Sequence, residues 1–209
     1  RANVISRIEP STREELLERW RYQFFILLGG ELVLLDTSEV LVTSSEIRSM
    51  VERVGKSLNA DYGDEELVVI GVLTGAYVFV ADLVRELRMP VVVDFIQVSS
   101  YDGTVSSGQL TVKKDISVSI EGRNVLIVED IIDTGYTLTK LKDMLLKRNP
   151  KSLKICTAFN KYERRVHNID IDYKGICIPN KFIVGYGLDY DGEFRNLRDV
   201  CVVSQYGGN

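Results

Sequence analysis

Histidine, cysteine and long apolar runs are scarce in this chain, and each scarcity narrows the possible functions. Its 209 residues include one histidine, His167, in a charged stretch, which argues against a histidine-based triad or a His-rich zinc site. The cysteines, Cys156, Cys177 and Cys201, are odd in number with apolar neighbours, so we expect buried thiols in a reducing compartment. No apolar run approaches the roughly 18 residues that span a bilayer, so we expect no membrane contact.

The chain also lacks a strong excess of either charge. Its 26 lysines and arginines face 30 aspartates and glutamates, a net charge of −4. Without a basic run of five or more residues, we expect no nucleic-acid partner. The length suffices for one domain with a sizeable core, or for one domain plus a small lobe. We expect a cytoplasmic protein, although an organelle stays open because the chain begins with Arg1 rather than methionine.

Apolar runs and helical repeats alternate along most of the chain. We predict buried strands at residues 67–73, 91–99, 125–128 and 154–159, and helices at residues 44–58 and 76–88. Apolar runs without polar alternation are typical of strands covered on both faces. Strand and helix in this order predict an α/β fold with a parallel sheet and right-handed crossovers.

The amino-terminal part has a helical pattern of its own. A capping signal at residues 11–15 precedes apolar residues at helical spacing between residues 16 and 28, before Gly29 and Gly30. We therefore predict that residues 1–39 form a helical extension. Its apolar face would pack on the core or contact a partner, and a targeting remnant is the other interpretation.

The most informative stretch runs from Val125 to Thr137. A buried strand ends in Glu129 and Asp130, and Asp133 follows, which places three acids in five positions. The carboxyl end of a parallel strand is the expected ligand edge of such a sheet. Carboxylates repel phosphate, so the first two acids would hold a metal ion or accept hydrogen bonds from sugar hydroxyls.

The residues after Asp133 enter a helix marked by leucines at positions 138, 141 and 145. Backbone N–H groups there, with the hydroxyls of Thr134 and Thr137, can cradle a phosphate at the positive end of the helix dipole. A phosphate beside a diol matches this set of polar groups. The stretch therefore predicts a site for a sugar phosphate.

Three other interpretations explain parts of this pattern. A strand can end in acids before an ordinary helix capped by a threonine. A response-regulator receiver also ends a strand in magnesium-binding acids, but it needs a phospho-acceptor aspartate on another strand. Asp-Thr-Gly also occurs in aspartic proteases, although those are β-rich, and Tyr136 and the helix that follows argue against them.

An apolar strand, two acids, two apolar residues and Asp-Thr-Gly before a helix resemble the type I phosphoribosyltransferase family. The resemblance extends from about residue 40 to residue 203, and residues 179–190 with Phe194 and Arg195 are similar to the hypoxanthine-guanine branch. It implies an α/β parallel-sheet fold with a small hood lobe built from the chain termini. The phosphoribosyltransferase domain would then span residues 40–209, and residues 161–203 would contribute a purine-binding hood.

The resemblance also assigns roles to residues of this chain. These are the proton acceptor Asp133; a phosphate loop of Asp133, Thr134, Gly135, Tyr136 and Thr137; the ribose and metal ligands Glu129 and Asp130; the pyrophosphate contacts Thr74, Gly75, Ser100, Tyr101 and Arg195; and the purine contacts Lys161, Phe182, Ile183 and Asp189, with Asp189 also a metal ligand. Many relatives have lysine where this chain has Thr74, and residues 99–109 would form a lid. Taken without the family, Lys161 could lie in a solvated charged loop and Phe182 in the core.

The implied activity is Mg2+-dependent transfer of a phosphoribosyl group from phosphoribosyl pyrophosphate to hypoxanthine or guanine. The products would be IMP or GMP and pyrophosphate, and the family implies a homodimer or homotetramer. A different class of function also fits these residues, namely a regulator that keeps the fold and senses nucleotides. That regulator could use the amino-terminal extension to contact a protein.

Overall fold

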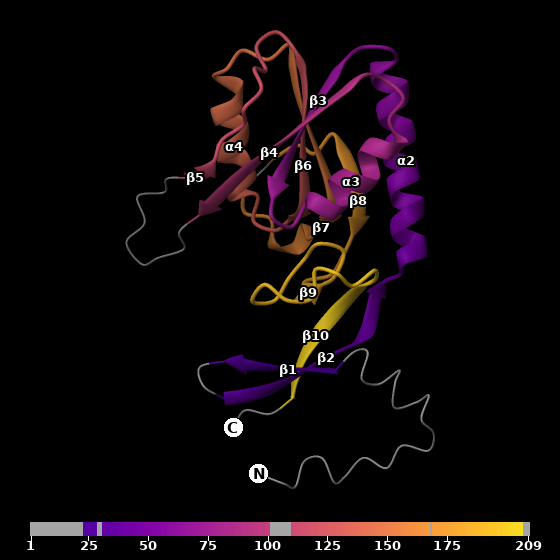
Figure 1. The fold of residues 1–209 in the computed structure, drawn as a ribbon, viewed down its shortest axis with the longest axis vertical. Helices are drawn as coiled ribbons and strands as arrows, with labels where there is room; N and C mark the ends of the chain where they lie inside the picture. The colour runs from indigo at the N-terminus through magenta and orange to yellow at the C-terminus, as the bar shows by residue number, and fades with distance from the viewer. Residues whose placement is uncertain (1–22, 29–30, 101–109, 168, 207–209) are drawn as a thin grey trace, which may run out of the picture.

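The computed structural model describes residues 23–28, 31–100, 110–167 and 169–206. Within these residues the chain forms a six-stranded sheet, a four-stranded sheet and the helices that cover the larger sheet. In Figure 1 the larger sheet lies above the smaller one, and the strands of the smaller sheet come from both ends of the chain. No helix of the described residues is long and apolar enough to cross a membrane.

The larger sheet has the strand order β5-β4-β3-β6-β7-β8. Its strands are β3 (Leu67–Leu73), β4 (Val91–Ser100), β5 (Leu110–Lys114), β6 (Asn124–Ile132), β7 (Ser152–Asn160) and β8 (Tyr173–Cys177). Neighbouring strands are parallel except β4 and β5, which are antiparallel. The strands predicted from apolar runs are thus confirmed, and the central ones are buried because helices cover both faces.

Helices α2 (Ser44–Tyr62) and α3 (Tyr77–Glu86) lie on one face of this sheet, and α4 (Tyr136–Leu146) lies on the other (Figure 1). Alternate residues of β3 point to opposite faces, as the pleat requires. Leu67 and Val69 pack with α2 and α3, whereas Val68 and Ile70 pack with α4. The sheet therefore separates two apolar cores.

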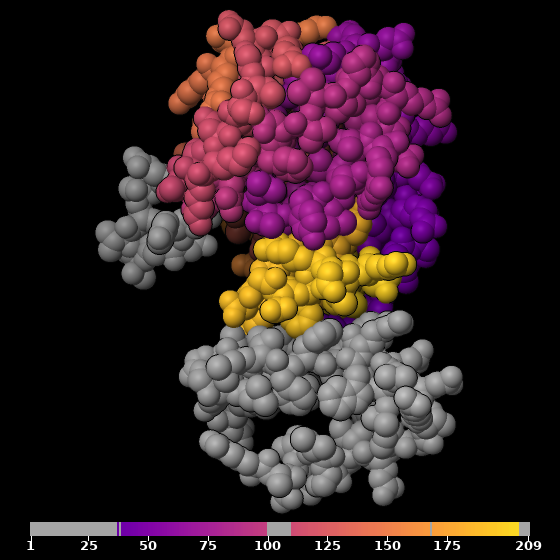
Figure 2. All heavy atoms as spheres, viewed as in Figure 1, coloured from indigo at the N-terminus to yellow at the C-terminus, as the bar shows by residue number. Residues whose placement is uncertain are grey.

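The smaller sheet joins the two ends of the chain. Its strands are β1 (Gln23–Leu28), β2 (Glu31–Val42), β9 (Ile183–Val184) and β10 (Val200–Tyr206), in the order β1-β2-β10-β9 and all antiparallel. Figure 2 shows the carboxy-terminal segment, in yellow, packed directly beneath the larger domain. The predicted α/β fold with a small lobe built from the termini is confirmed.

The helical extension predicted for residues 1–39 is wrong for residues 31–39, which belong to β2, and for residues 23–28, which form β1. This short apolar run fits either a helix or a strand, so its spacing could not decide between them. The register pairs Leu28 with Glu31, which leaves two residues, Gly29 and Gly30, as the connection. Two apolar runs separated by Gly-Gly are a hairpin signal that outweighs the helical spacing. Residues 12–22 lie outside the described residues.

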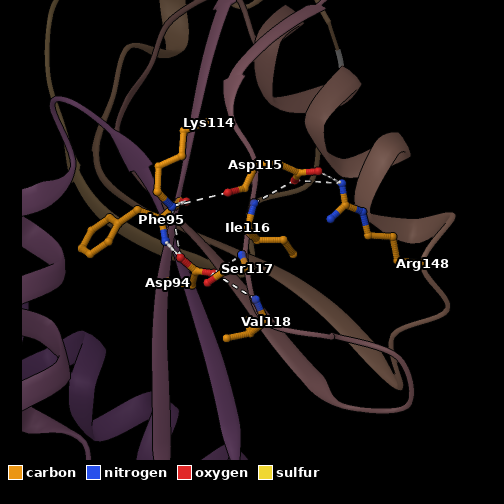
Figure 3. A network of polar contacts seen from close by, with 8 residues as sticks. All are labelled: Asp94, Phe95, Lys114, Asp115, Ile116, Ser117, Val118 and Arg148. Atoms are coloured by element: carbon orange, nitrogen blue, oxygen red, sulfur yellow. Dashed lines mark hydrogen bonds and ion pairs between the residues drawn. The ribbon is translucent and has the colours of Figure 1, made fainter.

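A buried aspartate on β4 fastens the chain that follows β5 to the sheet (Figure 3). The Asp94 carboxylate accepts hydrogen bonds from the N–H groups of Phe95, Ser117 and Val118 at 2.7, 2.5 and 3.2 Å, and from the Ser117 hydroxyl at 3.0 Å. Lys114 Nζ adds an ion pair at 3.2 Å. Burial opposes ionisation, but these donors outweigh it and hold the pKa of Asp94 well below its ordinary value.

Candidate active site

A cavity of about 440 Å³ opens where β3 and β6 end. This is the carboxyl edge of the parallel strands, where the sequence predicts a ligand site. The predicted site residues that line the cavity are Thr74, Gly75, Glu129, Asp130, Asp133, Thr134, Gly135, Thr137, Asp189 and Arg195. The structure therefore brings the β3 loop, the β6 loop and the carboxy-terminal segment together around one space.

The β6 loop presents the start of α4 to the cavity. Gly135 occupies the N-cap position with φ +82°, a left-handed conformation that glycine adopts without strain, and it supplies no side-chain cap. A Cβ at this position would lie 3.0 Å from the carbonyl oxygen of His167. Backbone N–H groups at a helix start are an anion site, so this loop is suited to a phosphate group.

Glu129 and Asp130 form a half-buried carboxylate pair at the end of β6, where both line the cavity. Burial, followed by the neighbouring Asp130 charge, raises the pKa of Glu129 well above its ordinary value. Burial likewise raises the pKa of Asp130, against hydrogen bonds that lower it. The pair therefore favours anything that compensates its charge, such as a cation or the hydroxyls of a sugar.

Two glycines allow the cavity walls to touch. A Cβ on Gly75 would lie 1.6 Å from Asp130 Oδ2, and a Cβ on Gly187 would lie 2.1 Å from the carbonyl oxygen of Gly75. Gly187 also has φ +96°. The β3 loop, which begins with a cis Leu73–Thr74 peptide bond, is thus packed between the carboxylate of β6 and the carboxy-terminal segment.

Arg195 is held in position at the cavity wall. Its Nη2 forms an ion pair with Asp189 Oδ1 at 2.8 Å, and its Nη1 donates to the carbonyl oxygen of Gly187 at 2.6 Å. Asp189 Oδ2 accepts the N–H of Gly192 at 2.8 Å. A fixed guanidinium is a suitable partner for a second phosphate group.

Of the four residues predicted to contact a purine, Asp189 lines this cavity, whereas Lys161, Phe182 and Ile183 lie outside its lining. Lys161 is buried at the end of β7, and its ammonium has no hydrogen bond or ion pair within the described part of the chain. Burial lowers its pKa, and the nearby Asp133 charge opposes that effect. Phe182 is 53% exposed and stands edge-on to Tyr190, with ring centroids 5.3 Å apart. Ile183 is buried in β9.

Three other predicted residues have different outcomes. Tyr101 lies outside the described residues, as does the side chain of Ser100, whose backbone ends β4. Their predicted pyrophosphate contacts, and the lid at residues 99–109, therefore stay predictions. Tyr136 does not line the cavity, and its ring lies against that of His167 with centroids 5.3 Å apart.

Sequence reasoning missed one residue that touches the site. Arg164, in the short 3-10 helix η2 (Tyr162–Arg164), forms an ion pair with Asp133 through Nη1 and Oδ2 at 3.0 Å. The charged run beside Lys161 is typical of a solvated loop, and no spacing rule indicates which of its arginines reaches the Asp133 carboxylate. The parallel pairing of β6 with β7 is what places this run beside Asp133.

The carboxylates fit a magnesium ion that substrate phosphates help to hold. Among the described residues, no cluster of three or more His, Cys, Asp or Glu side chains forms a complete metal cage. Magnesium usually binds through one or two carboxylates together with phosphate oxygens and water. Glu129 and Asp130, half-buried with raised pKa values, supply such carboxylates, and Asp189 lines the same cavity.

Known proteins are similar to this chain in sequence and in fold. Residues 41–191 match the model of the phosphoribosyl transferase domain. A hypoxanthine-guanine phosphoribosyltransferase of Streptococcus pneumoniae is 44% identical over 171 residues, which cover 81% of this chain and 95% of that protein. The bifunctional protein TilS/HprT of Listeria innocua is 44% identical over 196 residues, covering 91% of this chain but 30% of the relative.

Solved structures agree with the sequence matches. The hypoxanthine-guanine phosphoribosyltransferase of Bacillus anthracis has a TM-score of 0.77 and 41% identity, covering 81% of this chain and 99% of that one. The hypoxanthine phosphoribosyl transferase of Trypanosoma cruzi also has a TM-score of 0.77, with 43% identity, covering 80% of this chain and 92% of that one. The chain therefore belongs to the phosphoribosyl transferase family.

Proposed function

We propose that the protein transfers the 5-phosphoribosyl group of phosphoribosyl pyrophosphate to hypoxanthine or guanine, giving IMP or GMP and pyrophosphate. The observation that carries this proposal is the shared cavity, where the α4 start, the Glu129–Asp130 pair and Arg195 converge. A sugar that carries a phosphate at one end and a pyrophosphate at the other presents matching groups. Relatives named as hypoxanthine-guanine phosphoribosyltransferases support the same purine class.

The sugar end would be fixed by the β6 loop. The N–H groups of residues 134–137 would hold the 5-phosphate, and the two half-buried carboxylates would accept the ribose hydroxyls. This placement converts an encounter of two molecules into a reaction within one site. The pyrophosphate would lie against Thr74, Gly75 and Arg195, where the arginine is already positioned by Asp189.

The chemical step forms a bond between a purine imidazole nitrogen and the anomeric carbon, while the bond from that carbon to the pyrophosphate oxygen breaks. The proton on the base nitrogen would pass to Asp133, the carboxylate at the start of the β6 loop. Lys161 would donate to the exocyclic oxygen of a 6-oxopurine, and Phe182 would stack on the base beside the main chain of Ile183. Lys161 is buried, and its ammonium makes no hydrogen bond to the residues that the structure describes, which supports its part.

Magnesium would be held by Glu129, Asp130 and Asp189 together with the substrate. When bound, it would neutralise charge on the departing pyrophosphate. The raised pKa values of Glu129 and Asp130 mean that the empty site disfavours their charged forms despite the nearby Arg195 charge, which supports a cation in this place. We also propose that the protein works in the cytoplasm as a homodimer or homotetramer.

The domain assignment is also a proposal. Residues 40–209 would form the phosphoribosyltransferase domain, with residues 161–203 contributing the hood, and residues 1–39 would be an accessory segment. Strand β2 crosses the boundary at residue 40, so part of that segment belongs to the hood sheet by its backbone pairing.

Steady-state turnover tests the function directly. Hypoxanthine, guanine, xanthine, adenine and uracil would each be supplied with phosphoribosyl pyrophosphate and Mg2+, and nucleotide formation would be followed. We expect turnover of hypoxanthine and guanine, with adenine and uracil unreactive. A folded protein that converts none of the bases would refute the enzyme and favour a nucleotide-sensing regulator.

A further inference from the structure

The Asp133 carboxylate already forms an ion pair within the protein. Its Oδ2 is paired with Arg164 Nη1 at 3.0 Å, and its Oδ1 is enclosed and has no hydrogen-bond partner among the described residues. A proton acceptor must come within hydrogen-bond distance of the proton that it removes. In this structure Oδ1 is enclosed and Oδ2 is held by Arg164, although the Asp133 side chain as a whole is 35% exposed, so a substrate N–H group must compete with Arg164 for Oδ2.

The backbone that carries Arg164 is fastened to the same loop as Asp133. The N–H of Val166 donates to the carbonyl oxygen of Thr134 at 3.1 Å, and Arg165 Nε donates to that of Asp133 at 3.3 Å. These contacts use backbone oxygens and leave the Asp133 carboxylate to Arg164. The Arg164 side chain is 49% exposed, so it can turn into solvent without disturbing the anchored backbone.

Two other cations stay near Asp133 when Arg164 leaves. Lys161, which is buried, and Arg165 both interact electrostatically with Asp133. Departure of Arg164 would therefore remove one of three positive charges and leave Lys161 and Arg165 in place. The carboxylate would keep a compensating charge while an oxygen becomes available.

We propose that Arg164 is a positioning residue. In the substrate-free site its ion pair blocks the Asp133 carboxylate, and this ion pair breaks when the purine enters. The inference rests on the proposed function, because the purine N–H is the group that competes for Asp133. A site whose competent form is only partly populated shows a weaker apparent affinity in proportion to that population. Arg164 would thus set the Michaelis constant for the base, separately from that for the phosphoribosyl donor.

The kinetic test compares Arg164→Gln with Arg164→Lys. A partly exposed ion pair is weak, so the glutamine variant should lower KM for hypoxanthine roughly two- to fivefold. Its KM for the donor should stay the same, and its kcat should not fall. The lysine variant retains a cation and should resemble the wild type. Arg88→Gln is the charge-matched control, because its side chain has no hydrogen bond or ion pair within the described residues.

Ionic strength gives a second measurement that a purely structural role would not move. Salt screens exposed ion pairs, and hypoxanthine is neutral, so added salt should lower the wild-type KM for the base and leave that of Arg164→Gln nearly constant. If Arg164→Gln is active but its KM for hypoxanthine is unchanged or higher, Arg164 does not block Asp133, and the proposed function still stands. If the wild-type protein shows no turnover, both the proposed function and the role of Arg164 are wrong.

Discussion

Carboxylates on two strands that flank β3 behave in opposite ways. Asp94, on β4, receives backbone, hydroxyl and lysine donors, and its pKa lies well below the ordinary value. Glu129 and Asp130, at the end of β6, receive few donors, and burial raises the pKa of both. Asp94 has the more buried side chain by accessible surface and yet the lowered pKa, so the number of hydrogen-bond donors, and not burial alone, decides the difference.

Asp94 therefore stabilises the fold, whereas Glu129 and Asp130 are suited to binding a ligand. A buried charge whose hydrogen bonds come from the protein stabilises the native state. A half-buried pair with few donors destabilises the empty protein until a cation or sugar hydroxyls compensate it. Changes at Asp94 should therefore appear in stability, and changes at the β6 loop should appear in turnover.

The largest expected effect is the loss of turnover in Asp133→Asn. An amide cannot take the proton from the base, so kcat should fall about 10²- to 10⁴-fold while the unfolding temperature changes little. Steady-state assays and thermal melts check both parts. Asp143→Asn, on the exposed side of α4, is the matched control and should stay active. Full turnover of both purines by Asp133→Asn would show that another group accepts the proton.

The next effect is on stability. Asp94→Ala leaves the N–H groups of Phe95, Ser117 and Val118 without their acceptor, and it should lower the free energy of unfolding by about 3 kcal/mol. For a chain of this size that corresponds to roughly 6–12 °C in the unfolding temperature. Asp64→Ala, at an exposed position, should change little. An unfolding temperature equal to the wild type's would contradict the stabilising role.

A smaller effect on donor binding is expected from Gly75→Ala. The new Cβ would lie 1.6 Å from Asp130 Oδ2, so the β3 loop or the carboxylate must move. A shift of about 1 Å in a positioned site can reduce efficiency up to about 100-fold, and we expect the loss mainly as a raised KM for phosphoribosyl pyrophosphate. Gly63→Ala, where no atom lies within 4 Å but φ is +56°, should affect stability alone. Equal donor KM values for both variants would argue against close packing at Gly75.

The smallest expected effect is an opposite pH dependence of stability. Asp94 has a lowered pKa, so its contribution is present above the ordinary value of 3.8 and is lost as pH falls toward the folded value. The stability difference between wild type and Asp94→Asn should therefore shrink in acid. Glu129 has a raised pKa, so the protein without metal loses stability as pH rises above the ordinary value of 4.5.

Denaturant unfolding across this pH range measures both effects. Glu129→Gln should gain on the wild type as pH rises, because the amide carries no charge to bury. Added Mg2+ and phosphoribosyl pyrophosphate should reverse that order by stabilising the wild type more. Parallel pH profiles for the Asp94 and Glu129 variants would remove the distinction between the two kinds of carboxylate.

The sequence determined the central architecture because that information is local. Uninterrupted apolar runs required strands covered on both faces, and their alternation with helical repeats required parallel pairing. The acids that follow the β6 run, and the glycine at the α4 start, indicated the phosphate and cation chemistry of one loop without any knowledge of the other loops. The same reasoning from periodicity failed for residues 23–28, because a short apolar run fits both the helical and the strand periodicity.

Tertiary structure alone decided how separate loops meet. The contact of Gly75 with Asp130 and the ion pair of Arg164 with Asp133 join residues that are distant in sequence. The number of hydrogen-bond donors likewise distinguishes Asp94 from Glu129, although both residues follow apolar runs. Such properties depend on strand order and register, which bring chosen side chains within a few ångströms, and no periodicity in the sequence records that distance.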